Sequence, residues 1–351
     1  LSFMDAWDAM CRTVMSAGQR RGAMMACLRI DHPDIEDFID AKRDPARLRN
    51  FNVSALVTNS FMAALAADQD WPLQFDGEIY RTVRARDLWA RLMRATYDVA
   101  EPGVIFIDRV NASNNLAYCE TVSATNPCGE QPLPPYGACL LGSINLSRLV
   151  ESPFELNSRI DEARLADLTT TAVRFLDNVI DVSRYPLREQ EIEAKAKRRI
   201  GLGITGLADA LIFCNARYGA VDGVALTRRW LDTIRTAAYR ASAELAAEKG
   251  AFPAYEPALL DRPMLASLDA ETRAMIAEHG LRNGCLTTIA PTGTISLLAG
   301  NTSSGIEPVF AFSYQRRVRQ PDNSFVEEPV QDYALTLWKK QIGRASCRER
   351  V

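Results

Sequence analysis

The residues with the clearest chemical potential lie in one stretch, NPCGEQPLPPYGAC, at positions 126 to 139. Cys128 carries a thiol that can lose a proton or a hydrogen atom, Glu130 can exchange a proton with a hydroxyl group, and Asn126 can donate and accept hydrogen bonds. Cys139 can deliver electrons by closing a disulfide with another cysteine. The pattern therefore predicts redox or radical chemistry.

Simpler interpretations of the same residues stay open at this point. A buried cysteine often serves only as a small apolar side chain, and a glutamate in a loop is usually solvated. Metal binding by Cys128 and Cys139 is disfavoured, because neither belongs to a C-x-x-C pair and the only histidines are His32 and His279. We therefore predict no metal site.

Glycine and proline set the conformation of this stretch. They rule out a helix and a regular strand and so predict a tight, stiff loop. Alternate residues of an extended or turned backbone point the same way. Asn126, Cys128 and Glu130 are therefore expected to converge.

A second candidate site is the run Ala290-Pro291-Thr292-Gly293-Thr294-Ile295-Ser296. It combines a glycine, three hydroxyl groups and backbone N–H groups of the kind that bind phosphate, although by itself it also fits an ordinary turn rich in Ser and Thr. It has no Walker lysine, so ATP hydrolysis is not implied. The run 201 to 206, GLGITG, satisfies G-x-G-x-x-G, but a charged helical stretch precedes it, so we predict close packing at a helix junction and not dinucleotide binding.

The string ATNPCGEQPLPPYGACLLGSINL, residues 124 to 146, resembles the finger loop of the large catalytic subunit of ribonucleotide reductases. NPCGEQPL in particular resembles the class II enzymes, which depend on adenosylcobalamin (vitamin B12). Three further stretches agree in order and spacing: SAGQRRGAMMACLRIDHPDIEDFI (16 to 39), EPGVIFIDRVNASNNL (101 to 116) and IAPTGTISLLAGNTSSGIEPVFA (289 to 311).

The resemblance implies a fold and a mechanism. The fold is part of a ten-stranded α/β barrel of the radical-enzyme type, with the finger loop at its centre. Cys128 becomes a thiyl radical that abstracts the 3′ hydrogen of a ribonucleotide, Glu130 takes the 3′ hydroxyl proton, and Asn126 hydrogen-bonds the same region. Cys139 and a partner cysteine supply two electrons, and a thioredoxin-like donor reduces their disulfide.

The resemblance also assigns the other two motifs and the binding partners. Pro291, Thr292, Gly293, Thr294, Ile295 and Ser296 would hold the substrate phosphates. Arg20 and Arg21, otherwise a solvated turn, would belong to a specificity loop that responds to a deoxynucleotide or ATP effector at the interface of a homodimer. A reductase of another class, which uses a separate radical subunit, and a catalytically silent nucleotide-binding module remain the alternatives.

Some features depart from the family pattern. Leu140 stands where the family usually has Asn, the partner of Cys139 is expected upstream of Leu1, and the C-terminal cysteine pair of the family is absent. We expect residues 1–341 to be part of the catalytic barrel domain with both ends missing. Residues 342–351, IGRASCRERV, match a translated sequencing adapter and are expected to be an artefact.

Composition agrees with a globular α/β enzyme. The chain has 351 residues, 47% hydrophobic and 24% charged, with a net charge of −3. This balance gives no indication of a nucleic-acid or membrane surface, and no apolar run approaches the roughly 18 residues of a membrane span. Eight scattered cysteines favour the reducing cytoplasm.

Hydrophobic spacing predicts the elements that position these sites. Alternation of helices and strands favours an α/β core. Helices are expected at 3–16, 34–42, 57–69, 85–99, 160–182, 189–198, 205–214 and 226–249, and strands at 26–30, 103–107, 285–289 and 310–313.

Overall fold

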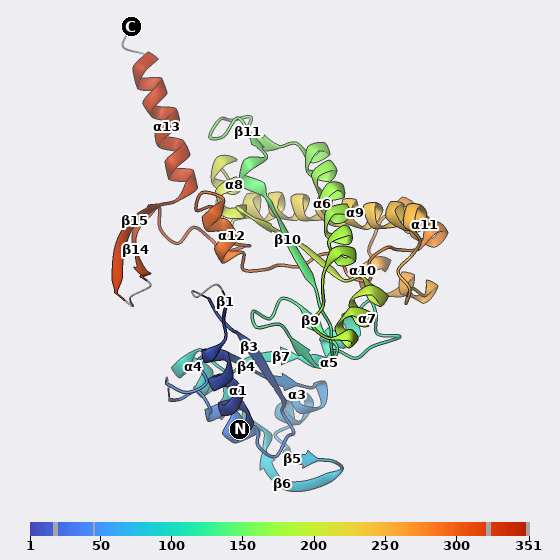
Figure 1. The fold of residues 1–351 in the computed structure, drawn as a ribbon. Helices are drawn as coiled ribbons and strands as arrows, with labels where there is room; N and C mark the ends of the chain where they lie inside the picture. The colour runs from blue at the N-terminus through green and yellow to red at the C-terminus, as the bar shows by residue number, and fades with distance from the viewer. Residues whose placement is uncertain (17–19, 45, 321–323, 349–351) are drawn as a thin grey trace. The chain divides into compact units, whose positions relative to one another are not determined.

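The structure is a computed structural model that describes residues 1–16, 20–44, 46–320 and 324–348. The chain divides into two compact units, residues 1–137 and 138–351, which are described separately (Figure 1). Both units combine helices with parallel strands, as the sequence predicts. No helix in the described ranges has the length and apolar character needed to cross a membrane.

The first unit is built on a parallel sheet with the order β3-β4-β7. In this sheet Ala26 pairs with Val53, and Ala55 pairs with Val104. Its elements are α1 (Ser2–Thr13), β1 (Met15–Ser16), β2 (Arg20–Arg21), β3 (Met24–Arg29), α2 (Ile35–Asp40), β4 (Phe51–Val57), α3 (Asn59–Ala66), β5 (Asp70–Phe75), β6 (Glu78–Arg84), α4 (Ala85–Val99), β7 (Gly103–Phe106), α5 (Ile107–Ser113), β8 (Ala124–Thr125) and β9 (Pro132–Leu133).

One hydrophobic core holds the first unit together. Burial of apolar side chains is the main stabilising contribution in such a core. Strand β4 supplies Phe51, Val53 and Ala55, while α3 and α4 supply Phe61 and Leu92, all of them buried. The strands are thereby fixed beneath the helices, and β3 and β4 can serve as a rigid base for the loop that follows β8.

The second unit is built around the parallel pair β10 and β13, whose register joins Leu140 to Ile200 and Asn145 to Thr205. Its elements are β10 (Leu140–Asn145), η1 (Leu146–Arg148), β11 (Val150–Glu151), β12 (Arg159–Ile160), α6 (Glu162–Val182), α7 (Arg188–Lys197), β13 (Ile200–Thr205), α8 (Leu207–Phe213), α9 (Val221–Lys249), η2 (Pro257–Asp261), α10 (Pro263–Ala266), α11 (Ala270–His279), α12 (Gly293–Leu298), β14 (Ser313–Arg319), β15 (Phe325–Gln331) and α13 (Tyr333–Arg348).

A buried ionic network in the second unit joins α6 to Arg198, directly after α7, and to Arg282, after α11. Asp177 has no exposed surface. Its carboxylate accepts hydrogen bonds from Arg198 at 2.8 Å and from Arg282 at 3.3 Å. Because a buried charge is tolerated only when it is paired, these contacts fix α6 against β13 and the chain after α11.

Most of the predicted helices are confirmed, and the differences concern the strands. Strand β4 occupies a stretch that precedes the helix predicted at 57–69 and was not foreseen. Residues 201 to 205, predicted as part of a helix junction, lie instead in the fully buried strand β13. At 285–289 only a single bridge forms, between Thr287 and Leu202, and the strand predicted at 310–313 begins at Ser313.

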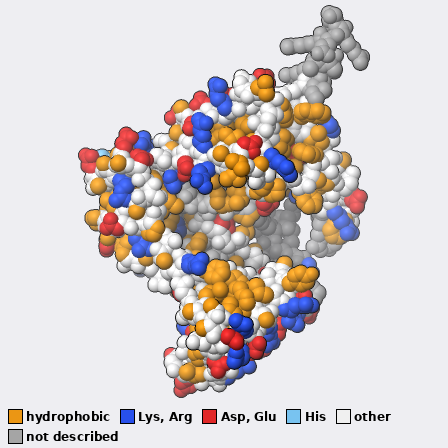
Figure 2. Space-filling model, turned by 180° about the vertical axis from the view of Figure 1, so that it is seen from behind, with side chains coloured by type: hydrophobic (Ala, Val, Ile, Leu, Met, Phe, Trp, Pro, Cys, Tyr) orange, Lys and Arg blue, Asp and Glu red, His pale blue; other side chains and the backbone are white. Residues whose placement is uncertain are grey.

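Charged side chains of both signs are mixed on the face drawn in Figure 2. Lys and Arg side chains are interspersed there with Asp and Glu side chains. This mixture is consistent with the small net charge of −3. On this face, the charge pattern gives no sign of a polyanion-binding surface.

Candidate functional site

Residues 126–131 of the predicted catalytic loop form the tip of a short hairpin in the first unit. Strands β8 and β9 pair Ala124 with Leu133 and Thr125 with Pro132, so the stretch 126–139 contains one short strand segment, β9, where the sequence analysis predicts none. At the tip, Cys128 is exposed and Glu130 is partly buried. The structure therefore presents the Cys128 thiol where a ligand can approach it.

Asn126 closes this loop on itself. Its backbone N–H donates to the Gln131 carbonyl at 3.1 Å, and its side-chain Oδ1 accepts the Gln131 N–H at 2.9 Å. Gly129 N–H donates to the Asn126 carbonyl at 3.0 Å. Oδ1 is therefore committed to the loop, and a contact from this side chain to a ligand would come from Nδ2.

The loop is also anchored on the sheet beneath it. Nδ2 of Asn52, on β4, donates to the carbonyl of Pro127 at 2.5 Å. On β3, burial raises the pKa of the Cys27 thiol, while a hydrogen bond from the Thr125 backbone opposes that shift. Residues on two neighbouring strands thus hold the chain immediately before Cys128, which sequence patterns did not reveal.

Cys139 belongs to the second unit, directly before β10. It is partly buried, and its Sγ lies 3.8 Å from the Leu140 carbonyl oxygen. Since β10 and β13 are parallel, Cys139 lies at their amino end. The predicted phosphate loop lies beyond their carboxyl end, where Thr205 contacts Thr292.

Two of the predicted phosphate-binding residues turn inward. Thr292 is 8% exposed, and its hydroxyl donates to Thr205 Oγ1 at 3.1 Å while accepting the Gly305 N–H at 2.7 Å. Ser296 is 2% exposed, and its Oγ lies 2.9 Å from the Gly293 carbonyl and 2.8 Å from Ser304 Oγ. These hydroxyl groups therefore hold the loop in shape.

Four residues of the same loop are exposed: Pro291, which has no backbone N–H, and the three residues Gly293, Thr294 and Ile295. Gly293, Thr294 and Ile295 form the first turn of α12, where an α-helix provides no carbonyl for its own N–H groups. Thr294 adds an exposed hydroxyl. If this loop binds an anion, these backbone N–H groups and the Thr294 hydroxyl are the donors that can reach it.

Glycine is required where the chain crosses itself behind this loop. A Cβ at Gly203 would lie 2.6 Å from the Thr288 carbonyl oxygen. At Gly305, which has φ +49°, a Cβ would lie 2.6 Å from the Ala290 carbonyl oxygen. The glycines of the 201 to 206 run therefore include one that allows close strand packing, which gives that motif a structural explanation.

Arg20 and Arg21 form strand β2, which pairs antiparallel with β1: Met15 lies opposite Arg21 and Ser16 opposite Arg20. The structure does not describe residues 17–19 or the side chains of the two arginines. Their predicted role in specificity stays a prediction.

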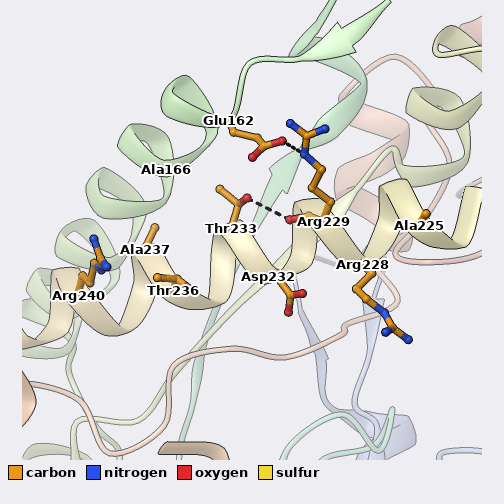
Figure 3. A pocket seen from close by; sticks show the side chains of 10 residues that line it. All are labelled: Glu162, Ala166, Ala225, Arg228, Arg229, Asp232, Thr233, Thr236, Ala237 and Arg240. Atoms are coloured by element: carbon orange, nitrogen blue, oxygen red, sulfur yellow. Dashed lines mark hydrogen bonds and ion pairs between the residues drawn. The ribbon is translucent and has the colours of Figure 1, made fainter. Parts of the chain in front are cut away.

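A surface groove of about 690 Å³ lies between α6 and α9, and none of its lining residues is a predicted site residue (Figure 3). Glu162 of α6 forms an ion pair with Arg229 of α9, and Thr233 Oγ1 donates to the Arg229 carbonyl at 3.0 Å. The ion pair and this hydrogen bond within α9 are the interactions drawn among the lining residues, and we assign no ligand to the groove.

The family comparison agrees with the α/β architecture. Residues 1–348 match the family described as "Ribonucleotide reductase, barrel domain". The chain therefore belongs to the ribonucleotide reductase barrel-domain family.

Individual relatives carry more specific names. The chain is 41% identical over 322 residues to "Vitamin B12-dependent ribonucleoside-diphosphate reductase" of Mycobacterium tuberculosis, covering 91% of this chain and 43% of that protein. A protein of the same name from Thermoplasma acidophilum is 37% identical over 321 residues, covering 91% and 39%. "Ribonucleoside-diphosphate reductase large subunit" of Caenorhabditis elegans is 28% identical over 373 residues, covering 93% and 46%. The chain spans less than half the length of each of these relatives.

Proposed function

We propose that this chain is the barrel portion of an adenosylcobalamin-dependent ribonucleotide reductase, which converts ribonucleotides to 2′-deoxyribonucleotides for DNA synthesis. The observation that carries the proposal is the exposed Cys128 thiol at the tip of a braced loop in a chain of this family. The similarity to two relatives named as vitamin B12-dependent supports the cofactor assignment.

Cys128 is proposed to act as a thiyl radical that takes the 3′ hydrogen atom of the ribose. Glu130, partly buried beside it in the loop, accepts the proton of the 3′ hydroxyl group. Asn126 Nδ2 donates to the same region, since its Oδ1 already closes the loop. These contacts favour loss of the 2′ hydroxyl group as water.

Cys139 supplies the electrons in this proposal. Two thiols, Cys139 and a partner cysteine outside this chain, give up two electrons and two protons and become a disulfide. The substrate correspondingly loses its 2′ oxygen as water and gains hydrogen, so the step is balanced. A thioredoxin-like dithiol then restores the pair, as expected for an enzyme of the reducing cytoplasm.

One feature of this chain, the exposure of Cys128, fits the chemistry of the cofactor. When bound, adenosylcobalamin supplies the organic radical that takes a hydrogen atom from a cysteine thiol. That chemistry requires a thiol that the cofactor can approach, and the Cys128 side chain is exposed. The Asn126 and Asn52 hydrogen bonds keep the loop backbone in place around it.

The phosphate loop is proposed to orient the substrate. Gly293, Thr294 and Ile295 offer backbone N–H groups to the substrate phosphates, and Thr294 adds a hydroxyl donor. Pro291, Thr292 and Ser296 complete the loop by shaping it. Arg20 and Arg21 are proposed to respond to a nucleotide effector at a homodimer interface.

Replacing Cys128 tests the proposed radical site. In the full-length reductase we expect Cys128→Ser to lower kcat by roughly 10³-fold or more, because a serine hydroxyl does not form the equivalent radical. Cys119→Ser is the matched control, since Cys119 is also exposed in the first unit, and it should keep the parental rate. Deoxyribonucleotide formation is the measurement. If Cys128→Ser kept full activity, the assignment of Cys128 as the radical site would be wrong, and only a nucleotide-binding role would remain for the loop.

A further inference from the structure

Asp209 is a buried acid that the proposed chemistry does not use. It lies in α8, where its neighbours Ala208, Ala210 and Leu211 are buried and apolar, and it is 0% exposed itself. Burying a carboxyl group is costly unless hydrogen bonds compensate. Asp209 Oδ2 accepts the backbone N–H of Ser303 at 2.7 Å.

Ser303 is bound tightly to the junction between β13 and α8. Its Oγ accepts the N–H groups of Ala208 at 3.1 Å and Asp209 at 3.3 Å. Its carbonyl accepts the Gly206 N–H at 2.7 Å and the Thr205 hydroxyl at 2.9 Å. Together with the Asp209 carboxylate, these contacts use the backbone N–H, the carbonyl and the side chain of Ser303.

The same segment holds the inward face of the phosphate loop. Thr292 donates to Thr205, which in turn donates to the Ser303 carbonyl. Ser296 shares a hydrogen bond with Ser304 at 2.8 Å, and its carbonyl accepts the Thr302 N–H at 3.1 Å. Both buried hydroxyl groups of the loop therefore depend on residues 302 to 305, the stretch that Asp209 fixes.

A second carboxyl group completes the arrangement. Asp332 is 5% exposed, and its Oδ1 accepts the Ala334 N–H at 2.9 Å. Burial, and next the charge of Asp332, raise the pKa of Asp209 to about 7. One proton shared between two buried carboxyl groups is the expected result, since two adjacent charges would repel each other. The pair thereby joins α8 to the start of α13.

We propose that Asp209 is a positioning residue for the phosphate loop: it fixes Ser303, and Ser303 fixes Thr292 through Thr205. The inference rests on the proposed function of the loop. Asp209 touches no part of the loop that faces a ligand, so it acts on substrate binding only through the geometry of Gly293, Thr294 and Ile295.

The test compares variants of the full-length reductase. Asp209→Ala removes the acceptor for Ser303 and should raise KM for the nucleotide about tenfold, with a smaller change in kcat. Asp209→Asn keeps an acceptor oxygen and should stay within about twofold of the parental KM. Thr205→Val removes the hydroxyl group that connects Ser303 to Thr292 and should raise KM as much as Asp209→Ala does. It replaces Asp209→Ala in the test if Asp209→Ala fails to fold.

Asp177→Asn is the control for general loss of stability. Asp177 is equally buried in the same unit, but it pairs with Arg198 and Arg282, so this variant should lower Tm without the selective rise in KM. An unchanged KM in both Asp209→Ala and Thr205→Val, or an equal rise in Asp177→Asn, would overturn the inference.

Amide hydrogen exchange separates this inference from the proposed function. Exchange across 291 to 296 should speed up in Asp209→Ala and Thr205→Val and stay unchanged in Asp209→Asn, whatever the enzyme's activity. If the parent reduces no nucleotide, the proposed function fails while exchange still reports on positioning. If exchange in the loop stays at the parental rate in all variants, the positioning role fails even for an active reductase.

Discussion

At the residue scale, the two candidate loops divide their polar groups between shape and chemistry. In the first loop Asn126 Oδ1 holds Gln131, and Cys128 remains exposed. In the second loop Thr292 and Ser296 are turned inward, and Thr294 remains exposed. Groups that hold a loop in one conformation reduce the entropy lost when a ligand binds, so in the proposed function both kinds of residue have a role.

The raised pKa of Asp209 predicts how stability changes with pH. In the unfolded chain this carboxyl group loses its proton near its ordinary pKa of 3.8, but in the folded protein it keeps the proton up to about pH 7. Between these values the folded state binds more protons, so the contribution to stability falls as pH rises. Asp209→Asn cannot lose a proton at this position. Its free energy of unfolding relative to that of the parent should therefore rise by on the order of 3 kcal/mol between pH 4 and pH 8.

Urea unfolding at several pH values measures this difference. Only the difference between the parent and Asp209→Asn is informative, because other carboxyl groups titrate in the same range. Asp177→Asn provides the contrast, since it removes the partner of two arginines and should be less stable than the parent at pH 8. A constant difference between parent and Asp209→Asn over the whole range would contradict the assignment of the shared proton.

At the element scale, the cap of α11 provides a local test of the fold. Asp269 Oδ1 accepts the Thr272 N–H at 2.9 Å, and Oδ2 accepts the Thr272 hydroxyl at 2.7 Å. These hydrogen bonds lower the pKa of Asp269 to about 2. Asp269→Ala should lower the free energy of unfolding by about 1 kcal/mol at pH 7.

The capping contribution should also depend on pH. It is fully present above the ordinary pKa of 3.8 and is lost as pH falls towards 2, so the difference between parent and Asp269→Ala should shrink over that range. Asp269→Asn retains a capping oxygen and should resemble the parent at pH 7. The midpoints of urea unfolding at pH 7 and pH 3 check both statements. If Asp269→Asn were as unstable as Asp269→Ala at pH 7, the capping role of Asp269 would be contradicted.

The sequence predicted some elements well and others poorly for identifiable reasons. Helix α4 was predicted with its observed bounds, because its apolar residues follow helical spacing. Strand β13 was missed because all six of its residues are buried, so it shows no alternation, and its glycines resemble a turn. Strand β4, also largely buried, was missed as well.

The same distinction applies to the candidate sites. Cys128 and Glu130 can be proposed from the sequence because they lie two positions apart in one loop. The roles of Thr292 and Asp209 cannot be, because their partners Thr205 and Ser303 lie far away in the sequence. The one available signal was an acid at position 209 within the otherwise apolar run 207 to 213.

At the scale of the whole molecule, the source of the radical remains to be tested. The relatives named as vitamin B12-dependent are 41% and 37% identical to this chain, whereas the large subunit from Caenorhabditis elegans is 28% identical. The proposed work of Cys128 is the same in both classes, although the string NPCGEQPL resembles the class II enzymes in particular. The chain covers 43% of the Mycobacterium tuberculosis relative, so the cofactor requirement is best measured on the full-length protein.

We expect the full-length reductase to form deoxyribonucleotides only when adenosylcobalamin and a dithiol reductant are both present. Each component is omitted in turn, and the Cys128→Ser variant under complete conditions gives the background rate. Product formation without cobalamin, but with an added radical-generating subunit, would move the protein to another reductase class and leave the roles of Cys128, Glu130 and Asn126 unchanged. Absence of product under every condition, from a folded protein that still binds nucleotide, would instead support a silent nucleotide-binding module.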